Sequence, residues 1–273
     1  MKWRRYVAIG DSFTEGMCDP LAGERPDTPS AGQRYAGWAD RLAVHLDDIA
    51  QSQSPPARVE YANLAVRGRL LADVVGPQVE AALALAPDLV SVVGGGNDIL
   101  RPKTDIDALS ASLEDAVARL RASGADVLMA TPMDPREAPV MKHTRGRAAA
   151  YAANIWSIAH RHGAFVIDQW TMAALRDWRL WAADRIHMNA EGHRRIALHA
   201  LHALGQPTDE QDWRSPLPDK QLPRGTEAIA ANVSWAREHV APWVRRRWRG
   251  ESSGDHLTAK APDLHLPTRT WAD

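Results

Sequence analysis

The feature that most constrains the fold is an alternation of short apolar runs with longer helical patterns, repeated five times along the first 204 residues. The runs are rich in Val, Ile and Leu, and several are apolar at consecutive positions, which is typical of strands covered on both faces. They lie at 6–10, 59–65, 88–96, 125–132 and 164–170. Helical patterns lie between or after them, at 36–50, 70–86, 106–124, 146–162 and 190–204. This alternation predicts a doubly wound α/β fold with a mainly parallel five-stranded sheet.

The composition changes after Gly205. Residues 206–225 are rich in Pro, Asp and Gln, and residues 226–250 have a helical pattern that Pro242 is expected to kink. Residues 251–273 show no clear periodicity. We therefore predict one core domain over residues 1–205 and a C-terminal helical or irregular extension over residues 206–273 that packs on it.

Composition excludes several classes of function. The formal net charge of the 273-residue chain is -1, so overall charge favours no nucleic acid as partner. The single cysteine, Cys18, excludes an intrachain disulfide and a metal site built on cysteines. No secretory signal and no run of about 18 apolar residues is present, which predicts a cytoplasmic protein without a membrane span. The basic cluster at 245–250 is interpreted as a solvated helix end, and the oligomeric state stays open.

Polar residues follow four of the predicted strands. They are the segments "GDS" (10–12), "NLAVRG" (63–68), "GGGND" (94–98) and "DRIHMNAEGH" (184–193). Ligands of doubly wound sheets bind outside the carboxyl ends of the strands, so these four segments are expected to form one site.

The residue types in these segments suit acyl transfer, which needs a nucleophile, a base, a group that orients the base, and donors for the oxyanion. Ser12 is the candidate nucleophile, and His187 is the candidate base because an imidazole titrates near working pH. Asp184, three residues earlier, is placed to fix the tautomer of the ring. Candidate oxyanion donors are the backbone N–H groups of Ser12 and Gly68 and the side-chain amide of Asn97.

The chain resembles the GDSL/SGNH hydrolase superfamily. Four of its blocks occur in order: "GDSF" with Ser12, a second block with Gly68, "GGGND" with Asn97, and "DRIH" with Asp184 and His187. The resemblance implies a flavodoxin-like core over residues 1–205 and serine esterase or lipase-type hydrolysis without a cofactor. It also implies that Ser12, Gly68 and Asn97 form the oxyanion hole and that Asp184 and His187 complete the triad.

We therefore predict a serine carboxylester hydrolase that acts through an acyl-enzyme on a small or short-acyl ester. Few phenylalanines and the lack of a broad apolar lid favour short chains. Thioesterase, lysophospholipase, carbohydrate deacetylase and acyltransferase remain alternatives, since each would use the same triad. A non-catalytic binding module is a further alternative, although a binding module has no need of a base paired to a hydroxyl.

A metal ion and a phosphate group are alternative ligands for residues of these segments. Asp184, His187 and His193 are metal-type residues, but a helix beginning near Asn189 would carry His193 away, so no metal site is predicted. "GGGND" lacks the Gly-Lys-Ser/Thr ending of a phosphate-binding loop. His193, Asp11 and Asp98 are interpreted as residues with structural hydrogen bonds.

The segment at 131–147 is long and follows the fourth predicted strand, on the side of the expected site. Long loops at such positions often determine specificity, so Met133, Arg136, Met141 and Arg145 are candidate substrate-binding residues. A solvated crossover loop is an equally open interpretation.

Overall fold

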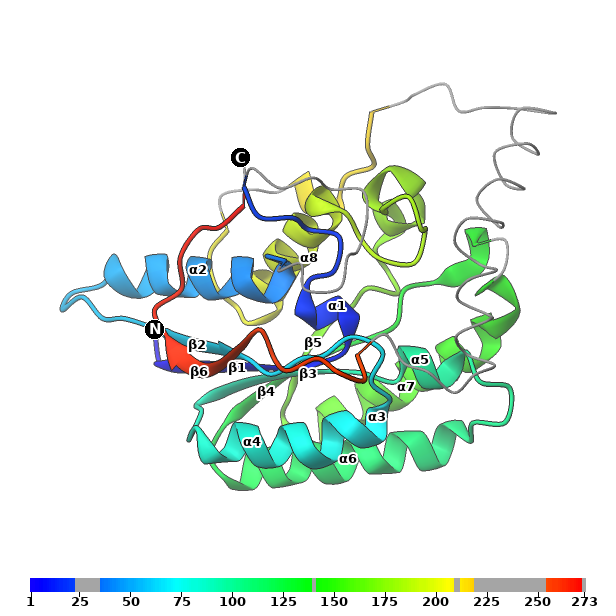
Figure 1. Cartoon of the computed structure of the whole chain (residues 1–273), viewed down its shortest axis with the longest axis horizontal. Helices are drawn as coiled ribbons and strands as arrows, with labels where there is room; N and C mark the ends of the chain where they lie inside the picture. The colour runs from blue at the N-terminus through cyan, green and yellow to red at the C-terminus, as the bar shows by residue number, and fades with distance from the viewer. Residues whose placement is uncertain (23–34, 139–140, 209–211, 219–253, 272–273) are drawn as a thin grey trace.

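The computed structural model describes residues 1–22, 35–138, 141–208, 212–218 and 254–271 (Figure 1). The predicted helix over 226–250, with Pro242 and the basic cluster at 245–250, lies outside the described residues. No helix in the described ranges combines the length and the apolar character needed to cross a bilayer.

One six-stranded sheet forms the centre of the molecule, with the strand order β5-β4-β3-β1-β2-β6. The first five strands are parallel to one another, as predicted. Their bounds are β1 Arg5–Gly10, β2 Glu60–Asn63, β3 Leu89–Val93, β4 Asp126–Ala130 and β5 Phe165–Ile167. Several of these strands end earlier than their apolar runs, because the predicted runs included residues of the loops that follow.

The sixth strand corrects the prediction of five. Strand β6 (Ala261–His265) comes from the extension that was predicted to be helical or irregular, and it pairs antiparallel with β2. Figure 1 shows this red segment lying along the edge of the sheet beside β2. The run contains Pro262, and a proline is tolerated in an edge strand because one side of that strand needs no hydrogen bonds.

The helices agree with four of the five predicted segments to within about two residues. The α-helices of the described residues are α1 Ser12–Glu15, α2 Trp38–Gln51, α3 Leu71–Asp73, α4 Val79–Ala84, α5 Gly96–Ile99, α6 Ile106–Ala122, α7 Arg145–His162 and α8 Ala190–Ala203. The short helices α1 and α5 were not among the predicted segments. The exception is the predicted helix over 70–86. A π-helical turn at Val74–Gln78 divides it into α3 and α4 around Pro77, which has no N–H to donate.

Helices cover both faces of the sheet (Figure 1). Tyr6 and Ala8 of β1 point to the core cluster shared with α2 and α8. Val7 and Ile9 point to the opposite cluster, shared with α4, α6 and α7. Because both faces of β1 are buried, its residues read as a continuous apolar run.

The strand order reverses direction beside β1, since β2 lies on one side of it and β3 on the other. The crevice at such a reversal is where doubly wound sheets bind ligands. Gly10 ends β1 here, and a Cβ at this position would lie 2.5 Å from the carbonyl oxygen of Val93 on β3. The absence of a side chain at Gly10 therefore lets the backbones of β1 and β3 lie close together where α1 begins.

Candidate active site

Ser12 is the first residue of α1, directly after β1. Asp11 is the N-cap of this helix, and its Oδ1 accepts a hydrogen bond of 3.1 Å from the backbone N–H of Phe13. The cap turns the chain sharply from strand to helix, which places the Ser12 hydroxyl at the carboxyl edge of the sheet. Asp11 thus has the structural role predicted for it.

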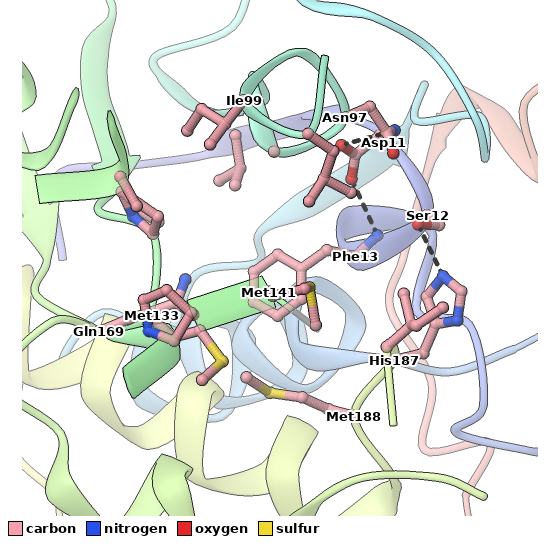
Figure 2. A pocket seen from close by; sticks show the side chains of 18 of the residues that line it. Asp11, Ser12, Phe13, Asn97, Ile99, Met133, Met141, Gln169, His187 and Met188 are labelled. Atoms are coloured by element: carbon pink, nitrogen blue, oxygen red, sulfur yellow. Dashed lines mark hydrogen bonds between the residues drawn. The ribbon is translucent and has the colours of Figure 1, made fainter. Parts of the chain in front are cut away.

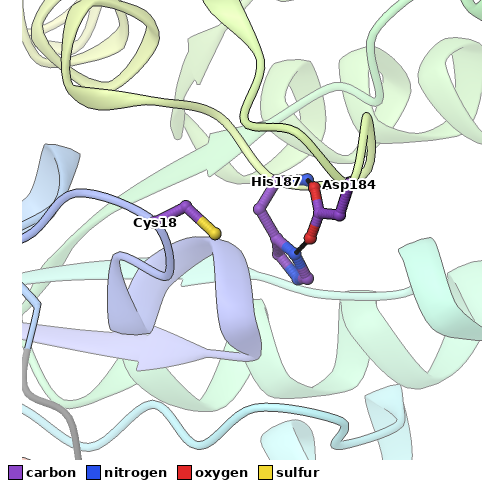
Figure 3. A group of neighbouring side chains, drawn as sticks. All are labelled: Cys18, Asp184 and His187. Carbon is purple, nitrogen blue, oxygen red and sulfur yellow. Dashed lines mark hydrogen bonds and ion pairs between the residues drawn. The ribbon is translucent and has the colours of Figure 1, made fainter. Parts of the chain in front are cut away.

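A chain of hydrogen bonds joins Ser12, His187 and Asp184, although Ser12 and His187 are 175 positions apart. The Nε2 atom of His187 lies 3.0 Å from Ser12 Oγ, and its Nδ1 atom lies 2.6 Å from Asp184 Oδ2 (Figures 2 and 3). The other carboxylate oxygen of Asp184 accepts from the backbone N–H groups of Ile186 at 2.9 Å and His187 at 3.0 Å. Asp184 therefore holds both the backbone and the ring of His187.

The electrostatics of the pair favour proton transfer to the imidazole. Burial by itself lowers the pKa of His187, but the hydrogen bond and the charge of Asp184 outweigh burial and raise the pKa above its usual value. Burial likewise raises the pKa of Asp184, but its bonds to the His187 side chain and to backbone N–H groups lower it overall. The carboxylate is therefore ionised and stabilises an imidazolium at His187.

Gly68 lies between two residues that are tied to the elements carrying Ser12 and Asn97. The N–H of Arg67 donates to the Glu15 carboxylate at the end of α1, at 2.7 Å. The carbonyl of Arg69 accepts from Asn97 Nδ2 on α5, at 3.0 Å. Gly68 itself has a φ of 75°, a conformation that glycine adopts without strain. These bonds hold the Gly68 turn between α1 and α5.

The side-chain amide of Asn97 also faces Asp11. Its Nδ2 atom lies 3.4 Å from Asp11 Oδ2, a long hydrogen bond, and burial raises the pKa of Asp11 to about 6. Because this hydrogen bond is long, it holds the amide proton only weakly, and the proton is available to a developing oxyanion.

An apolar pocket of about 220 Å³ opens beside Ser12. Figure 2 shows Ser12 and His187 at one end of the view, with Ile99, Met133 and Gln169 toward the other. Most of its lining is apolar and comes from several elements: Met17, Val93, Ile99, Leu100, Pro132, Met133, Met141, Ala148, Tyr151, Trp181 and Met188.

The structure brings two of the four predicted substrate-binding residues to this pocket. Met133 and Met141 line it, whereas Arg136 and Arg145 are not among the lining residues. Arg145 Nε lies 2.7 Å from Asp134 Oδ1, and the Asp134 side chain is only 2 % exposed. A buried carboxylate needs cationic partners, which explains why Arg145 turns away from the pocket.

Sequence reasoning missed Tyr151, which lines the pocket from α7. Its hydroxyl donates to the carbonyl of Gly94 at 3.1 Å, and a Cβ on Gly95 would lie 2.7 Å from the same hydroxyl. Tyr151 therefore packs against the glycine loop that carries Asn97. A lone large side chain in the alanine-rich run "RAAAYAAN" was the available signal.

His193 has the structural role that was predicted. It is fully buried on α8, where Nδ1 accepts from the N–H of Trp38 at 3.2 Å and Nε2 donates to the carbonyl of Met17 at 3.1 Å. Burial lowers its pKa to about 4, so the ring stays neutral. Both nitrogens are occupied, so His193 is not available to a metal.

Cys18, by contrast, lies beside the His187–Asp184 pair (Figure 3). One donor atom from each of the three residues lies within 4.8 Å of the others, and the contact with Cys18 contributes to the raised pKa of His187. These atoms are donors that metal ions can bind, but the His187 ring and the Asp184 carboxylate are hydrogen-bonded to each other. The expectation that no metal is held here stays a prediction. A single cysteine gives no sequence pattern, so its place went unpredicted.

A doubly wound α/β fold with a Ser–His–Asp chain at its switch point defines the hydrolase class of protein. The model of the GDSL-like Lipase/Acylhydrolase family matches residues 8–195. The chain belongs to this family, as the sequence resemblance predicted, and is an enzyme that hydrolyses ester bonds.

Solved structures share the fold at low sequence identity. LAE5, an alpha/beta hydrolase from the metagenome of Lake Arreo in Spain, is 24 % identical with a TM-score of 0.57, covering 74 % of this chain and 95 % of its own. TesA is 20 % identical with a TM-score of 0.56, and the match covers 74 % of this chain and 98 % of TesA. Axe2, an acetylxylan esterase from Geobacillus stearothermophilus, is 22 % identical with a TM-score of 0.55, covering 75 % and 95 %. No curated protein matches the chain.

Proposed function

We propose that the chain is a serine carboxylester hydrolase in which Ser12 is the nucleophile. The observation that carries the proposal is the distance of 3.0 Å between Ser12 Oγ and His187 Nε2, combined with 2.6 Å between His187 Nδ1 and Asp184. His187 removes the Ser12 proton as Oγ attacks the ester carbonyl, and Asp184 stabilises the resulting imidazolium.

In this mechanism the negative charge moves to the carbonyl oxygen of the substrate. The backbone N–H groups of Ser12 and Gly68 and the Asn97 amide donate to that oxygen. His187 then gives its proton to the leaving alcohol, and an acyl-enzyme remains on Ser12. Water, deprotonated by His187, attacks the acyl carbon and releases the acid, which restores the Ser12 hydroxyl.

The apolar pocket supports a substrate with a short- to medium-chain acyl group. His187 protonates the leaving alcohol, so the alcohol lies near His187 and the acyl chain extends into the pocket away from it. A cavity of about 150 Å³ holds benzene, so the 220 Å³ of this pocket corresponds to roughly six to nine carbons. This extends the short-acyl preference expected from the sequence.

Thioesterase, lysophospholipase, carbohydrate deacetylase and acyltransferase activities would use the same residues. The likeness to the acetylxylan esterase Axe2 concerns the fold alone. An acetyl group would leave most of the pocket empty, which favours longer acyl esters over acetylated sugars. A panel of p-nitrophenyl esters from acetyl to dodecanoyl, with matched thioesters and acetylated xylan, separates these substrates.

The Ser12→Ala variant tests the nucleophile. We expect it to lose ester hydrolysis and labelling by a fluorophosphonate, because no hydroxyl remains for His187 to activate. Ser112→Ala is the matched control, since Ser112 lies exposed on α6. Unchanged hydrolysis by Ser12→Ala would overturn the mechanism.

The Asn97→Ala variant tests the oxyanion hole. Loss of one oxyanion donor is expected to lower kcat by about 10²-fold or more. Asn154→Ala on α7, whose amide bonds Ser110 at 3.0 Å, is the control. Unchanged turnover in Asn97→Ala would show that Asn97 is not an oxyanion donor.

A further inference from the structure

We propose that Lys260, in the C-terminal extension, is a positioning residue for the proposed reaction: it holds the nucleophile helix α1 and the Gly68 turn in their active geometry. The inference rests on the proposed role of Ser12. It concerns a part of the chain beyond residues 8–195, which the family model matches.

The Lys260 ammonium is enclosed by four oxygen atoms. Its Nζ lies 2.6 Å from the carbonyl of Glu15, 2.8 Å from that of Tyr35, 2.6 Å from that of Ala36 and 2.6 Å from Asp40 Oδ2. The side chain is only 11 % exposed, so water contributes little to its solvation. A buried ammonium with this many acceptors is held in one place.

These carbonyls belong to two backbone segments that cross closely. A Cβ on Gly16 would lie 2.4 Å from the carbonyl oxygen of Ala36, and a Cβ on Gly37 would lie 2.4 Å from the Cα of Gly16. Close packing brings several carbonyl oxygens together, and their partial negative charges repel. The ammonium of Lys260 offsets this repulsion and joins the two segments.

The contact with Glu15 bears on Ser12 because α1 consists only of Ser12–Glu15. A helix of one turn is not stable by itself, so its geometry depends on tertiary contacts. Asn63 Nδ2 donates to the carbonyl of Thr14 at 2.9 Å, and Lys260 donates to that of Glu15. These two donors fix the carboxyl end of the helix that carries the nucleophile.

The side chain of Glu15 links the carboxyl end of α1 to the turn that carries Gly68, a proposed oxyanion donor. Its buried carboxylate accepts from the backbone N–H of Arg67 at 2.7 Å and pairs with the Arg67 guanidinium. Gly254, also in the extension, packs so closely on this turn that a Cβ there would lie 2.0 Å from the carbonyl oxygen of Arg67. The extension therefore contacts both α1 and the residue preceding Gly68.

Strand β6 holds the lysine in register. Lys260 immediately precedes β6, whose Ala261 pairs with Asn63 of β2 (Figure 1). Because Asn63 also binds α1, the strand pairing sets Lys260 beside the element it holds. The strand pairing thus fixes the backbone from which the ammonium makes its contacts.

The Lys260→Met variant tests the proposal, because methionine keeps much of the side-chain volume without the charge. Ester hydrolysis is measured per active site, with sites counted by complete fluorophosphonate labelling so that unfolded protein does not enter the rate. We expect kcat to fall about tenfold or more through misplacement of the nucleophile and the oxyanion donors, while KM stays within about threefold. The rate of labelling is expected to fall with kcat.

Arg269→Met is the matched control, because Arg269 joins the extension to Asp48 through an exposed ion pair of 3.3 Å that shares no residue with the Lys260 contacts. Lys260→Gln retains N–H donors and replaces Lys260→Met in the test if the methionine variant does not fold. Its kcat is expected to lie between the values for the wild type and for Lys260→Met. A kcat per labelled site equal to wild type in Lys260→Met or Lys260→Gln overturns the proposal, as does an equal loss in Arg269→Met. Activity in Ser12→Ala would instead overturn the proposed function.

Discussion

The two histidines at 187 and 193 lie on neighbouring elements, yet their surroundings give them opposite properties. His187 lies in the turn before α8 with one nitrogen on Asp184 and the other on Ser12. His193 lies in the first turns of α8 with both nitrogens on backbone groups. The pKa of His187 is raised by its carboxylate partner, and the pKa of His193 is lowered to about 4 by burial.

The comparison shows that the partner of a buried histidine decides its use. A carboxylate makes the ring a base, because the imidazolium is stabilised as it forms. Hydrogen bonds to backbone groups keep the ring neutral, and in His193 they connect α8 to Trp38 and Met17. The one ring is suited to moving protons and the other to holding the fold.

The largest expected effect is on His187. In His187→Ala we expect kcat for ester hydrolysis to fall about 10⁴-fold or more, because no base remains for Ser12. Thermal unfolding is expected to change little, since the ring supports no core contact comparable to that of His193. Exposed His160 on α7 supplies the control, His160→Ala. A His187 variant with near-normal turnover would break the comparison.

His193→Ala is expected to act on stability instead. It leaves the buried N–H of Trp38 without its acceptor and opens a cavity, which together cost about 3 kcal/mol. For a chain of this size, that loss lowers Tm by roughly 6–12 °C. Scanning calorimetry measures the shift, and activity per folded molecule is expected to persist. A stable but inactive His193→Ala would reverse the assigned roles.

The same ring predicts a pH dependence of stability. The pKa of His193 is about 4 in the folded protein and 6.5 in the unfolded chain, so the unfolded state binds the extra proton between these values. Stability is therefore lost as pH falls from 6.5 to 4, by on the order of 3 kcal/mol from this residue. His193→Gln lacks this proton, so its urea unfolding is expected to depend less steeply on pH. Equal pH dependence in both proteins would contradict the buried neutral ring.

The smallest expected effect concerns Cys18. The proposed mechanism needs neutral His187, so kcat/KM is expected to rise with pH through a pKa above 6.5. The contact with Cys18 helps to raise that pKa, so Cys18→Ala is expected to move the rise to lower pH. The pH profile of kcat/KM for p-nitrophenyl esters measures the shift. A rise moved to higher pH would show that the thiol lowers the pKa of His187.

The sequence predicts the sheet and the Ser12–His187 geometry well, for physical reasons. Strands such as β1 are buried on both faces and read as apolar runs, and doubly wound topology brings their carboxyl ends to one edge. Asp184 and His187 are three residues apart, so a single turn suffices to bring them together. The catalytic roles of these residues stay predictions until they are tested.

Features that depend on contacts between distant residues could not be predicted from the sequence. Arg145 was expected at the substrate, but the buried carboxylate of Asp134 holds it. Strand β6 has no apolar alternation and contains Pro262, so only the open edge of β2 makes it a strand. Tyr151 reaches the pocket because of how α7 packs, which a helical period alone does not specify.

The pairing of β6 with β2 also sets an order of events during synthesis. A ribosome makes the chain from its N-terminus, so Ser12, Asn97 and His187 are all synthesised before Lys260. Until β6 has emerged, β2 lacks its pairing with this strand, and the carbonyls of Glu15, Tyr35 and Ala36 lack the ammonium of Lys260. A nascent chain that already carries every residue of the proposed triad is therefore expected to reach full activity only after its extension has been made.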